Sequence, residues 1–172
     1  MNIDLHSYIR DVPDFPYPGI LFKDITPLIE HPEAFRAALD GLEALCKDRK
    51  IDKIVGVESR GFLFGAPLAD RLGVGFVMAR KKGKLPSKII SISYELEYGS
   101  NTIEMHSDSI TENDHVLLID DVLATGGTSR AVCSLIEQLG GTVDALLFVL
   151  ELSFLKGREH LKNREVLSLM KY

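Results

Sequence analysis

The sequence lacks the features that mark several large classes of protein. Its 172 residues include no tryptophan and only two cysteines, Cys46 and Cys133. The cysteines form no C-x-x-C pair and lie in apolar helical patterns, so the sequence indicates neither a thiolate metal site nor thiol redox chemistry. No apolar run approaches the roughly 20 residues that span a bilayer, and residues 1–10 are too polar for a secretory signal. We therefore expect a cytoplasmic protein without a membrane partner.

An excess of positive charge is also missing. The formal net charge is −5, with 20 Lys and Arg against 25 Asp and Glu, so the chain offers no global basic field for nucleic acid. An anionic ligand must therefore meet a local positive site. The length suits a single domain over residues 1–172, and the contents of 45% hydrophobic and 26% charged residues are typical of globular domains.

The apolar pattern predicts helices and strands in alternation. Helical spacing of apolar residues covers residues 35–46, 63–72 and 128–139. Short apolar runs predict buried strands at residues 54–57, 74–79, 115–119 and 143–150. Repeated strand–helix–strand units predict an α/β fold with a central, mainly parallel sheet flanked by helices.

Two segments do not fit this alternation. Residues 13–19 contain three prolines and Gly19 and are expected to form a loop. Residues 89–96 and 102–105 alternate polar and apolar side chains, which predicts an antiparallel two-stranded ribbon that stands off the sheet. Ligands of parallel sheets bind beyond the carboxyl ends of the strands. That rule selects residues 58–61, residues 120–128 and the segment after Leu150.

The segment from Val116 to Thr128 carries the most informative pattern. Four apolar residues precede Asp120 and Asp121, which we expect to lie at the end of a strand and to face a ligand. The glycines that follow let the backbone curl around a phosphate, and the N–H groups at the start of the next helix favour an anion. Two carboxylates suit the hydroxyls of a sugar. The alternative is an acidic helix start followed by a simple glycine turn.

The same segment, V-L-L-I-D-D-V-L-A-T-G-G-T, resembles the phosphoribosyl pyrophosphate signature of type I phosphoribosyltransferases. The resemblance implies that Asp120 and Asp121 act on the ribose as catalytic residues. It assigns the 5′-phosphate to Ala124, Thr125, Gly126, Gly127 and Thr128. The chain contains no G-x-x-x-x-G-K loop, and Gly73 and Gly75 precede a strand instead of following one, which argues against a triphosphate loop and a dinucleotide fold.

Two further segments resemble pyrophosphate-binding parts of the same family. Residues 58–62, E-S-R-G-F, resemble its pyrophosphate loop and imply a cis peptide bond between Glu58 and Ser59. Residues 80–86 resemble the R-K-x-G-K-L-P segment of adenine phosphoribosyltransferases, although a solvated basic loop would have the same composition. The pyrophosphate candidates are Glu58, Ser59, Arg60, Arg80, Lys81 and Lys84, and Lys82 is expected to face solvent. Ser59 is not a hydrolase nucleophile in a G-x-S-x-G elbow, because Val57 stands at the first glycine position.

Residues 94–99, 18–25 and 156–159 resemble the hood, the base-recognition segment and the C-terminal L-K-G-R-E stretch of adenine phosphoribosyltransferases. The resemblance implies an adenine slot formed by Leu21, Phe22, Lys23, Tyr98 and Leu152. Many members carry arginine where this chain has Lys23. Glu97 is assigned the transfer of a base proton, with a surface carboxylate as the alternative. The five histidines form no H-E-x-x-H motif and are read as structural or solvated.

The resemblance implies an adenine phosphoribosyltransferase of purine salvage, which converts adenine and phosphoribosyl pyrophosphate to AMP and diphosphate. It implies a core at about residues 33–150, a small hood from about 1–30 and 151–172, and a flexible catalytic ribbon at about 88–106. It also implies a homodimer, and Mg²⁺ held mainly by substrate and water without dedicated protein ligands. Two rivals are a hypoxanthine-guanine enzyme and a regulator that senses phosphoribosyl pyrophosphate. The regulator lacks support because the chain has no spare length or basic module for DNA.

Overall fold

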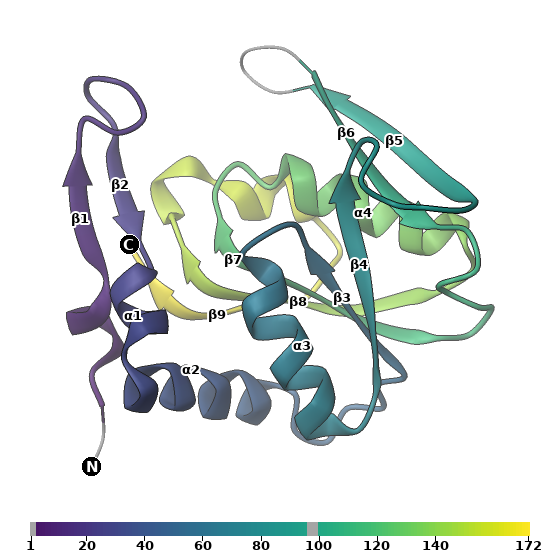
Figure 1. Ribbon diagram of the computed structural model, residues 1–172, viewed down its shortest axis with the longest axis horizontal. Helices are drawn as coiled ribbons and strands as arrows, with labels where there is room; N and C mark the ends of the chain where they lie inside the picture. The colour runs from purple at the N-terminus through teal and green to yellow at the C-terminus, as the bar shows by residue number, and fades with distance from the viewer. Residues whose placement is uncertain (1–2, 96–99) are drawn as a thin grey trace.

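The computed structural model describes residues 3–95 and 100–172 (Figure 1). The helices are η1 (Leu5–Tyr8), α1 (Thr26–Glu30), α2 (Pro32–Leu45), α3 (Gly61–Leu72), α4 (Gly127–Gln138), η2 (Ser153–Leu155) and η3 (Gly157–Leu161). The strands are β1 (Arg10–Pro13), β2 (Leu21–Asp24), β3 (Lys53–Val57), β4 (Gly75–Lys81), β5 (Ile89–Glu95), β6 (Ser100–His106), β7 (His115–Leu123), β8 (Thr142–Glu151) and β9 (Val166–Lys171). Within the described ranges, no helix is long and apolar enough to cross a membrane.

The main sheet is mostly parallel. Among the described residues it contains seven strands in the order β5-β6-β4-β3-β7-β8-β9. From β4 to β9 the neighbouring strands pair in parallel, whereas β6 pairs antiparallel with both β4 and β5. The predicted α/β fold with a mainly parallel sheet is confirmed. The antiparallel ribbon is also present, but it does not stand off the sheet as predicted, because β6 pairs with the end of β4 at Arg80 and Lys81.

Helices cover both faces of the sheet, which explains the apolar runs in the sequence. Leu147 and Val149 of β8 belong to the core cluster that also contains residues of α1, α2 and α3. Leu146 and Phe148 belong to the second cluster, which contains the buried face of α4. Successive strand residues point to opposite faces, so a strand covered on both faces is apolar at nearly every position. The sheet is therefore the middle layer of the core.

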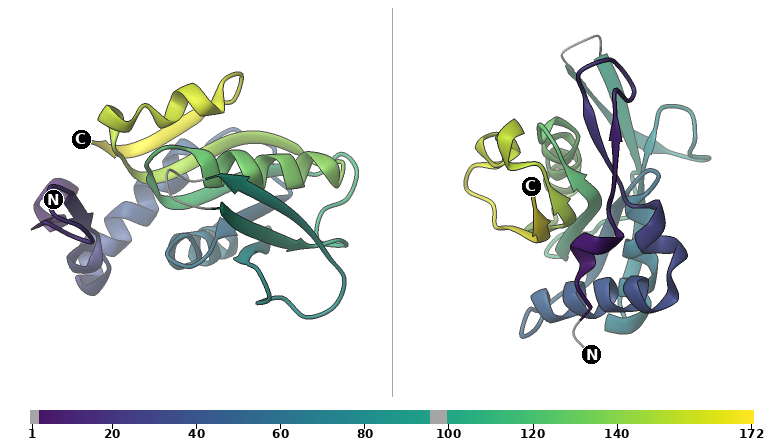
Figure 2. Two further views of the ribbon diagram at one scale, coloured as in Figure 1. Left: turned by 90° about the horizontal axis from the view of Figure 1, so that it is seen from above. Right: turned by 90° about the vertical axis from the view of Figure 1, so that its left-hand side faces the viewer.

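Two antiparallel pairs rise beyond one end of the sheet. Strands β1 and β2 form a separate two-stranded sheet, and β5 and β6 form the ribbon. Both pairs extend past the same end in Figure 1 and in the right panel of Figure 2. The expected loop at residues 13–19 is the connection within the first pair, whose flanking strands the sequence did not predict. The space between the two pairs lies above the carboxyl ends of β3 and β7.

Candidate active site

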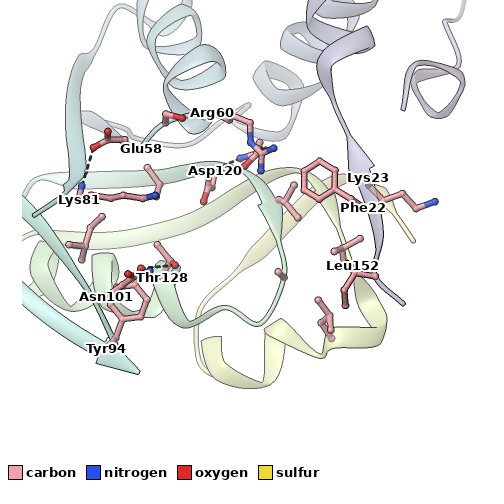
Figure 3. A pocket seen from close by; sticks show the side chains of 18 of the residues that line it. Phe22, Lys23, Glu58, Arg60, Lys81, Tyr94, Asn101, Asp120, Thr128 and Leu152 are labelled. Carbon is pink, nitrogen blue, oxygen red and sulfur yellow. Dashed lines mark hydrogen bonds and ion pairs between the residues drawn. The ribbon is translucent and has the colours of Figure 1, made fainter. Parts of the chain in front are cut away.

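A cavity of about 920 Å³ lies at this end of the sheet (Figure 3). Its size is in the range of ligand-binding pockets, roughly 300–1,000 Å³. Segments far apart in the chain line it, from the connection between β1 and β2 to the residues after β8. Figure 3 shows Phe22 and Leu152 on one side, Tyr94 and Thr128 on the opposite side, and Asp120 between them. The sequence rule for ligands at strand ends therefore locates the pocket correctly.

The acidic pair lies within a strand, and this corrects the prediction of a strand end at Ile119. Strand β7 continues to Leu123, and Asp121 is only 4% exposed. Oδ2 of Asp121 lies 2.6 Å from Nε of Arg60. Burial and the neighbouring charge of Asp121 raise the pKa of Asp120 well above its usual range. Burial also raises the pKa of Asp121, and Arg60 opposes that rise. Both shifts disfavour the ionised carboxyl groups, and a positive charge placed beside the pair would oppose them as Arg60 does.

Arg60 reaches the acidic pair because α3 begins directly against β7. A Cβ atom added to Gly61 would lie 2.8 Å from the carbonyl oxygen of Ile119, so only glycine permits this approach. The Arg60 guanidinium carbon also lies 5.5 Å from the centre of the Phe22 ring. The peptide bond between Glu58 and Ser59 is cis, as predicted. The loop before α3 thus connects the carboxylates to the apolar side of the cavity.

The basic segment is held by Glu58. Nε of Arg80 donates to Oε2 of Glu58 at 3.1 Å, and the Lys81 amide donates to the same oxygen at 3.0 Å. Burial alone would raise the pKa of Glu58, but these hydrogen bonds lower the pKa below its usual range. Lys81 lines the cavity, whereas Arg80 and Lys84, both in the described part of the chain, are not in its lining. Lys82 is exposed, as predicted.

The glycine-rich loop forms the opposite wall. Ala124 and Thr128 line the cavity, Thr125 is exposed, and α4 begins at Gly127. Gly126 has a φ of 82°, a value that favours glycine. The backbone N–H groups that follow it at the start of α4 can bind an anion. Tyr94 of β5, which the sequence analysis included in the hood segment without a role of its own, lines the cavity with its hydroxyl 2.9 Å from Oγ1 of Thr128.

The other side of the cavity is apolar. It is lined by Leu21 and Phe22 of β2 and by Leu152, which follows β8. Ile20 and Phe154 add exposed apolar surface, with exposed fractions of 49% and 66%. Such a concentration of apolar side chains around a pocket marks a ligand surface. Ile20 belongs to the base-recognition segment at residues 18–25, and Phe154 and Leu155 belong to the segment after Leu150, but the sequence analysis assigned none of the three a role of its own.

The ammonium group of Lys23 is directed away from the cavity. Its Nζ lies 2.6 Å from Oδ1 of Asp11 and 4.4 Å from the centre of the Tyr172 ring. Figure 3 shows the side chain pointing outward, so only its backbone and stem border the pocket. Glu97 and Tyr98 lie outside the described residues.

Comparison with known proteins places the chain in a family. Residues 28–153 match the family model of the phosphoribosyl transferase domain. The adenine phosphoribosyltransferase of Carboxydothermus hydrogenoformans is 54% identical over 170 residues, which are 99% of this chain and 100% of the relative. The chain belongs to the adenine phosphoribosyltransferase family. It is therefore an enzyme of the glycosyltransferase class.

Solved adenine phosphoribosyltransferases share the whole fold. That of Thermoanaerobacter pseudethanolicus is 50% identical, with a TM-score of 0.95 and 98% of each chain covered. That of Saccharomyces cerevisiae is 45% identical, with a TM-score of 0.89 and 94% of each chain covered. The yeast enzyme is complexed with adenine and D-2,5-dideoxy-2,5-imino-altritol 1,6-bisphosphate. The type I phosphoribosyltransferase fold implied by the sequence is thus confirmed.

The fold of this phosphoribosyltransferase brings most of the predicted site residues to one cavity. The predicted residues in its lining are Leu21, Phe22, Lys23, Glu58, Ser59, Arg60, Lys81, Asp120, Asp121, Ala124, Thr128 and Leu152. Within the described chain, Arg80, Lys84, Thr125, Gly126 and Gly127 lie outside that lining. Of these, Arg80 contacts Glu58, and Gly126 has the positive φ that shapes the glycine-rich loop. The individual roles remain predictions.

Proposed function

We propose how the cavity performs the reaction of this enzyme, in which adenine and phosphoribosyl pyrophosphate give AMP and diphosphate in purine salvage. One observation carries the proposal. Asp120 and Asp121 lie in one cavity between a glycine-rich loop and an apolar slot. The cavity thus has an anion site first, then the two carboxyl groups, then the apolar slot. This order matches the order of phosphate, ribose and base in AMP.

The phosphoribosyl half of the substrate binds along the loops after β3 and β7. Residues 124–128 hold the 5′-phosphate through hydroxyl groups and the N–H groups that begin α4. Asp120 and Asp121 accept hydrogen bonds from the 2′- and 3′-hydroxyls. The pyrophosphate meets Ser59, Arg60 and Lys81, while Glu58 holds the basic segment that carries Lys81.

Adenine binds between Phe22 and Leu152, with the Leu21 main chain supplying a donor and an acceptor to the base edge. Lys23 contributes through its backbone, because its ammonium is paired with Asp11. The family resemblance assigns Tyr98 to the adenine slot and its hood. Glu97 exchanges a proton with the base near N7 as N9 becomes bonded to C1′.

In the reaction, the bond from C1′ to the pyrophosphate oxygen breaks, the bond from C1′ to N9 forms, and adenine loses one proton. Positive charge develops at C1′ and is stabilised by Asp120 and Asp121. When bound, Mg²⁺ neutralises the charge of the departing pyrophosphate. The residues present fit this ion, since Asp120 and Asp121 offer carboxylate oxygens beside the ribose site. The ion is held mainly by substrate oxygens and water, as is usual for Mg²⁺.

We also propose the division of the chain that the family resemblance implies, with a core at about 33–150, a hood from about 1–30 and 151–172, and a catalytic ribbon at about 88–106. Cys46 and Cys133 are both free and buried, which suits a reducing, cytoplasmic location.

A homodimer is proposed because Arg80 and Lys84 do not line the cavity of their own chain in the described structure, and Lys84 is exposed. In a dimer, the basic segment contributes to the pyrophosphate site of the neighbour. Analytical ultracentrifugation at assay concentration is expected to show a dimer, and a fully active monomer would contradict this.

The activity is tested by offering adenine, hypoxanthine and guanine together with phosphoribosyl pyrophosphate and Mg²⁺, and by identifying the nucleotide by mass spectrometry. AMP is the expected product. IMP or GMP as the main product indicates the hypoxanthine-guanine alternative. Binding of phosphoribosyl pyrophosphate without any nucleotide product indicates the regulator.

A further inference from the structure

The segment Lys156–Glu159 has no part in the reaction described above, yet it forms the back of the phosphate loop. Gly157 is buried, and a Cβ atom added there would lie 2.2 Å from the carbonyl oxygen of Ala124. A Cβ atom added to Gly126 would lie 2.6 Å from the carbonyl oxygen of Gly157. The two backbones therefore touch without intervening side chains, and a shift of Gly157 must move the loop.

Arg158, the next residue, fixes this segment to the sheet. Its Nε donates to Oε1 of Glu151 at 2.6 Å, and its Nη2 donates to Oε2 at 2.7 Å. Its Nη1 donates to the carbonyl oxygen of Val166 at 2.8 Å. The hydroxyl of Ser168 donates to Oε2 of Glu151 at 2.8 Å. The planar guanidinium thus makes three directed contacts, a geometry that lysine cannot reproduce.

Glu151 connects this ion pair to the apolar slot. It is only 5% exposed, it ends β8, and Leu152 follows it at the wall of the cavity. The Leu152 amide donates to the carbonyl oxygen of Leu123 at 2.9 Å, and Leu123 directly precedes Ala124. The ion pair of Glu151 and Arg158 therefore connects the segment behind the glycine-rich loop to Leu152, at the wall of the apolar slot.

We propose that Arg158 is a positioning residue that sets the distance between the 5′-phosphate loop and the adenine slot. This inference rests on the proposed function, because AMP is the molecule that spans both walls. Adenine alone needs only the slot, and ribose 5-phosphate alone needs only the loop and the carboxylates. Binding of the joined molecule depends on the separation of the two half-sites, whereas binding of each fragment does not.

The test compares Arg158→Met with the wild-type full-length chain in calorimetric titrations of AMP, adenine and ribose 5-phosphate. The Kd of AMP is expected to rise about tenfold or more, because small errors in relative placement remove much of the gain from joining two ligands. The Kd values of the two fragments are expected to change less than about twofold, since each half-site stays intact. In turnover, KM for both substrates stays near the wild-type value while kcat falls.

Two more variants make the result decisive. Arg158→Lys keeps the charge without the three directed contacts, so it is expected to lie between wild type and Arg158→Met, and it gives the same comparison if the methionine variant does not fold. Arg49→Met is the matched control, because Arg49 makes a two-pronged pair with Glu165 at 2.8 and 2.9 Å and does not line the cavity of the described chain. Its affinities for all three ligands are expected to stay unchanged.

The inference is overturned if Arg158→Met weakens AMP and both fragments equally, which indicates a general loss of packing, or if it leaves AMP binding unchanged. In both cases wild-type protein still produces AMP, so the proposed function stands. Wild-type protein that neither produces nor binds AMP overturns the proposed function and this inference together.

Discussion

Asp121→Asn removes one of two adjacent carboxyl groups at the proposed ribose site and keeps the shape of the side chain. Oδ2 of Asp121 lies 2.6 Å from Nε of Arg60, and breaking a buried ion pair costs about 3–5 kcal/mol. The Arg60 side chain, however, is 42% exposed and can turn toward water. The substitution also removes the like charge beside Asp120, which together with burial raises the pKa of Asp120. The free energy of unfolding is therefore expected to fall by about 1 kcal/mol or less, as for exposed pairs.

The effect of Asp121→Asn on turnover is expected to be much larger. A preorganised electrostatic contact to charge that develops at the reacting centre is worth about 10²–10³-fold in kcat. Steady-state kcat at saturating substrates and urea unfolding are measured on the same preparation. Asp40→Asn is the control, because it removes a surface contact to Arg71 at 2.7 Å and is expected to leave kcat unchanged. A kcat of Asp121→Asn within about twofold of wild type refutes the reasoning, and so does a fall in unfolding free energy large enough to account for the lost activity.

Three further changes test other parts of the site and the fold. Glu97→Gln is expected to lower turnover by about 10²–10⁴-fold with little change in affinity for phosphoribosyl pyrophosphate, and a near wild-type single-turnover rate contradicts the proton-transfer role. Tyr94→Phe removes the hydroxyl 2.9 Å from Oγ1 of Thr128 and is expected to raise KM for phosphoribosyl pyrophosphate by about 2–10-fold, the worth of one hydrogen bond; an unchanged KM refutes its part in phosphate binding. Burial alone would raise the pKa of Asp24, but hydrogen bonds from Thr26 lower this pKa to about 2. Because the folded pKa is depressed, Asp24 stabilises the protein above about pH 4 and loses this contribution as the pH falls toward 2. In Asp24→Asn, the urea midpoint of unfolding is expected to depend less on pH in this range than it does in the wild type. An unaltered dependence of the midpoint on pH contradicts this role of Asp24.

The central strands could be predicted because a strand buried on both faces needs apolar residues at nearly every position. Residues 143–150 are apolar at nearly every position, and β8 at Thr142–Glu151 is covered on both faces. The helical spacing over 35–46 corresponds to α2 at Pro32–Leu45 for a similar reason, since its buried residues face one side. The glycine-rich loop at the cavity could be predicted because its glycines and acids are adjacent in the chain.

The end of β7 was predicted too early because hydropathy does not report backbone pairing. Its ladder with β8 continues past Ile119, with Asp120 opposite Phe148 and Val122 opposite Leu150. Polar residues that face a ligand can belong to a strand as long as their backbone hydrogen bonds are made. A strand end at a site is therefore set by the neighbouring strand as much as by its own side chains.

Contacts between distant residues left no signal in the sequence. Tyr94 and Thr128 are 34 positions apart, and neither residue type marks the other as a partner. The pairing of Lys23 with Asp11 is equally hidden, because it depends on the hairpin of β1 and β2. That hairpin consists of short strands in which half of the residues are charged, and the apolar residues of β2, Leu21 and Phe22, line the cavity instead of the core.

The central claim is that one cavity orders phosphate, ribose and base from the glycine-rich loop to the apolar slot. A crystal structure of the protein with AMP tests this most directly. The account predicts the 5′-phosphate at residues 124–128, the ribose hydroxyls within hydrogen-bond distance of Asp120 and Asp121, and the adenine ring between Phe22 and Leu152. A nucleotide bound in the reverse direction, or with its ribose away from the two carboxylates, would contradict it.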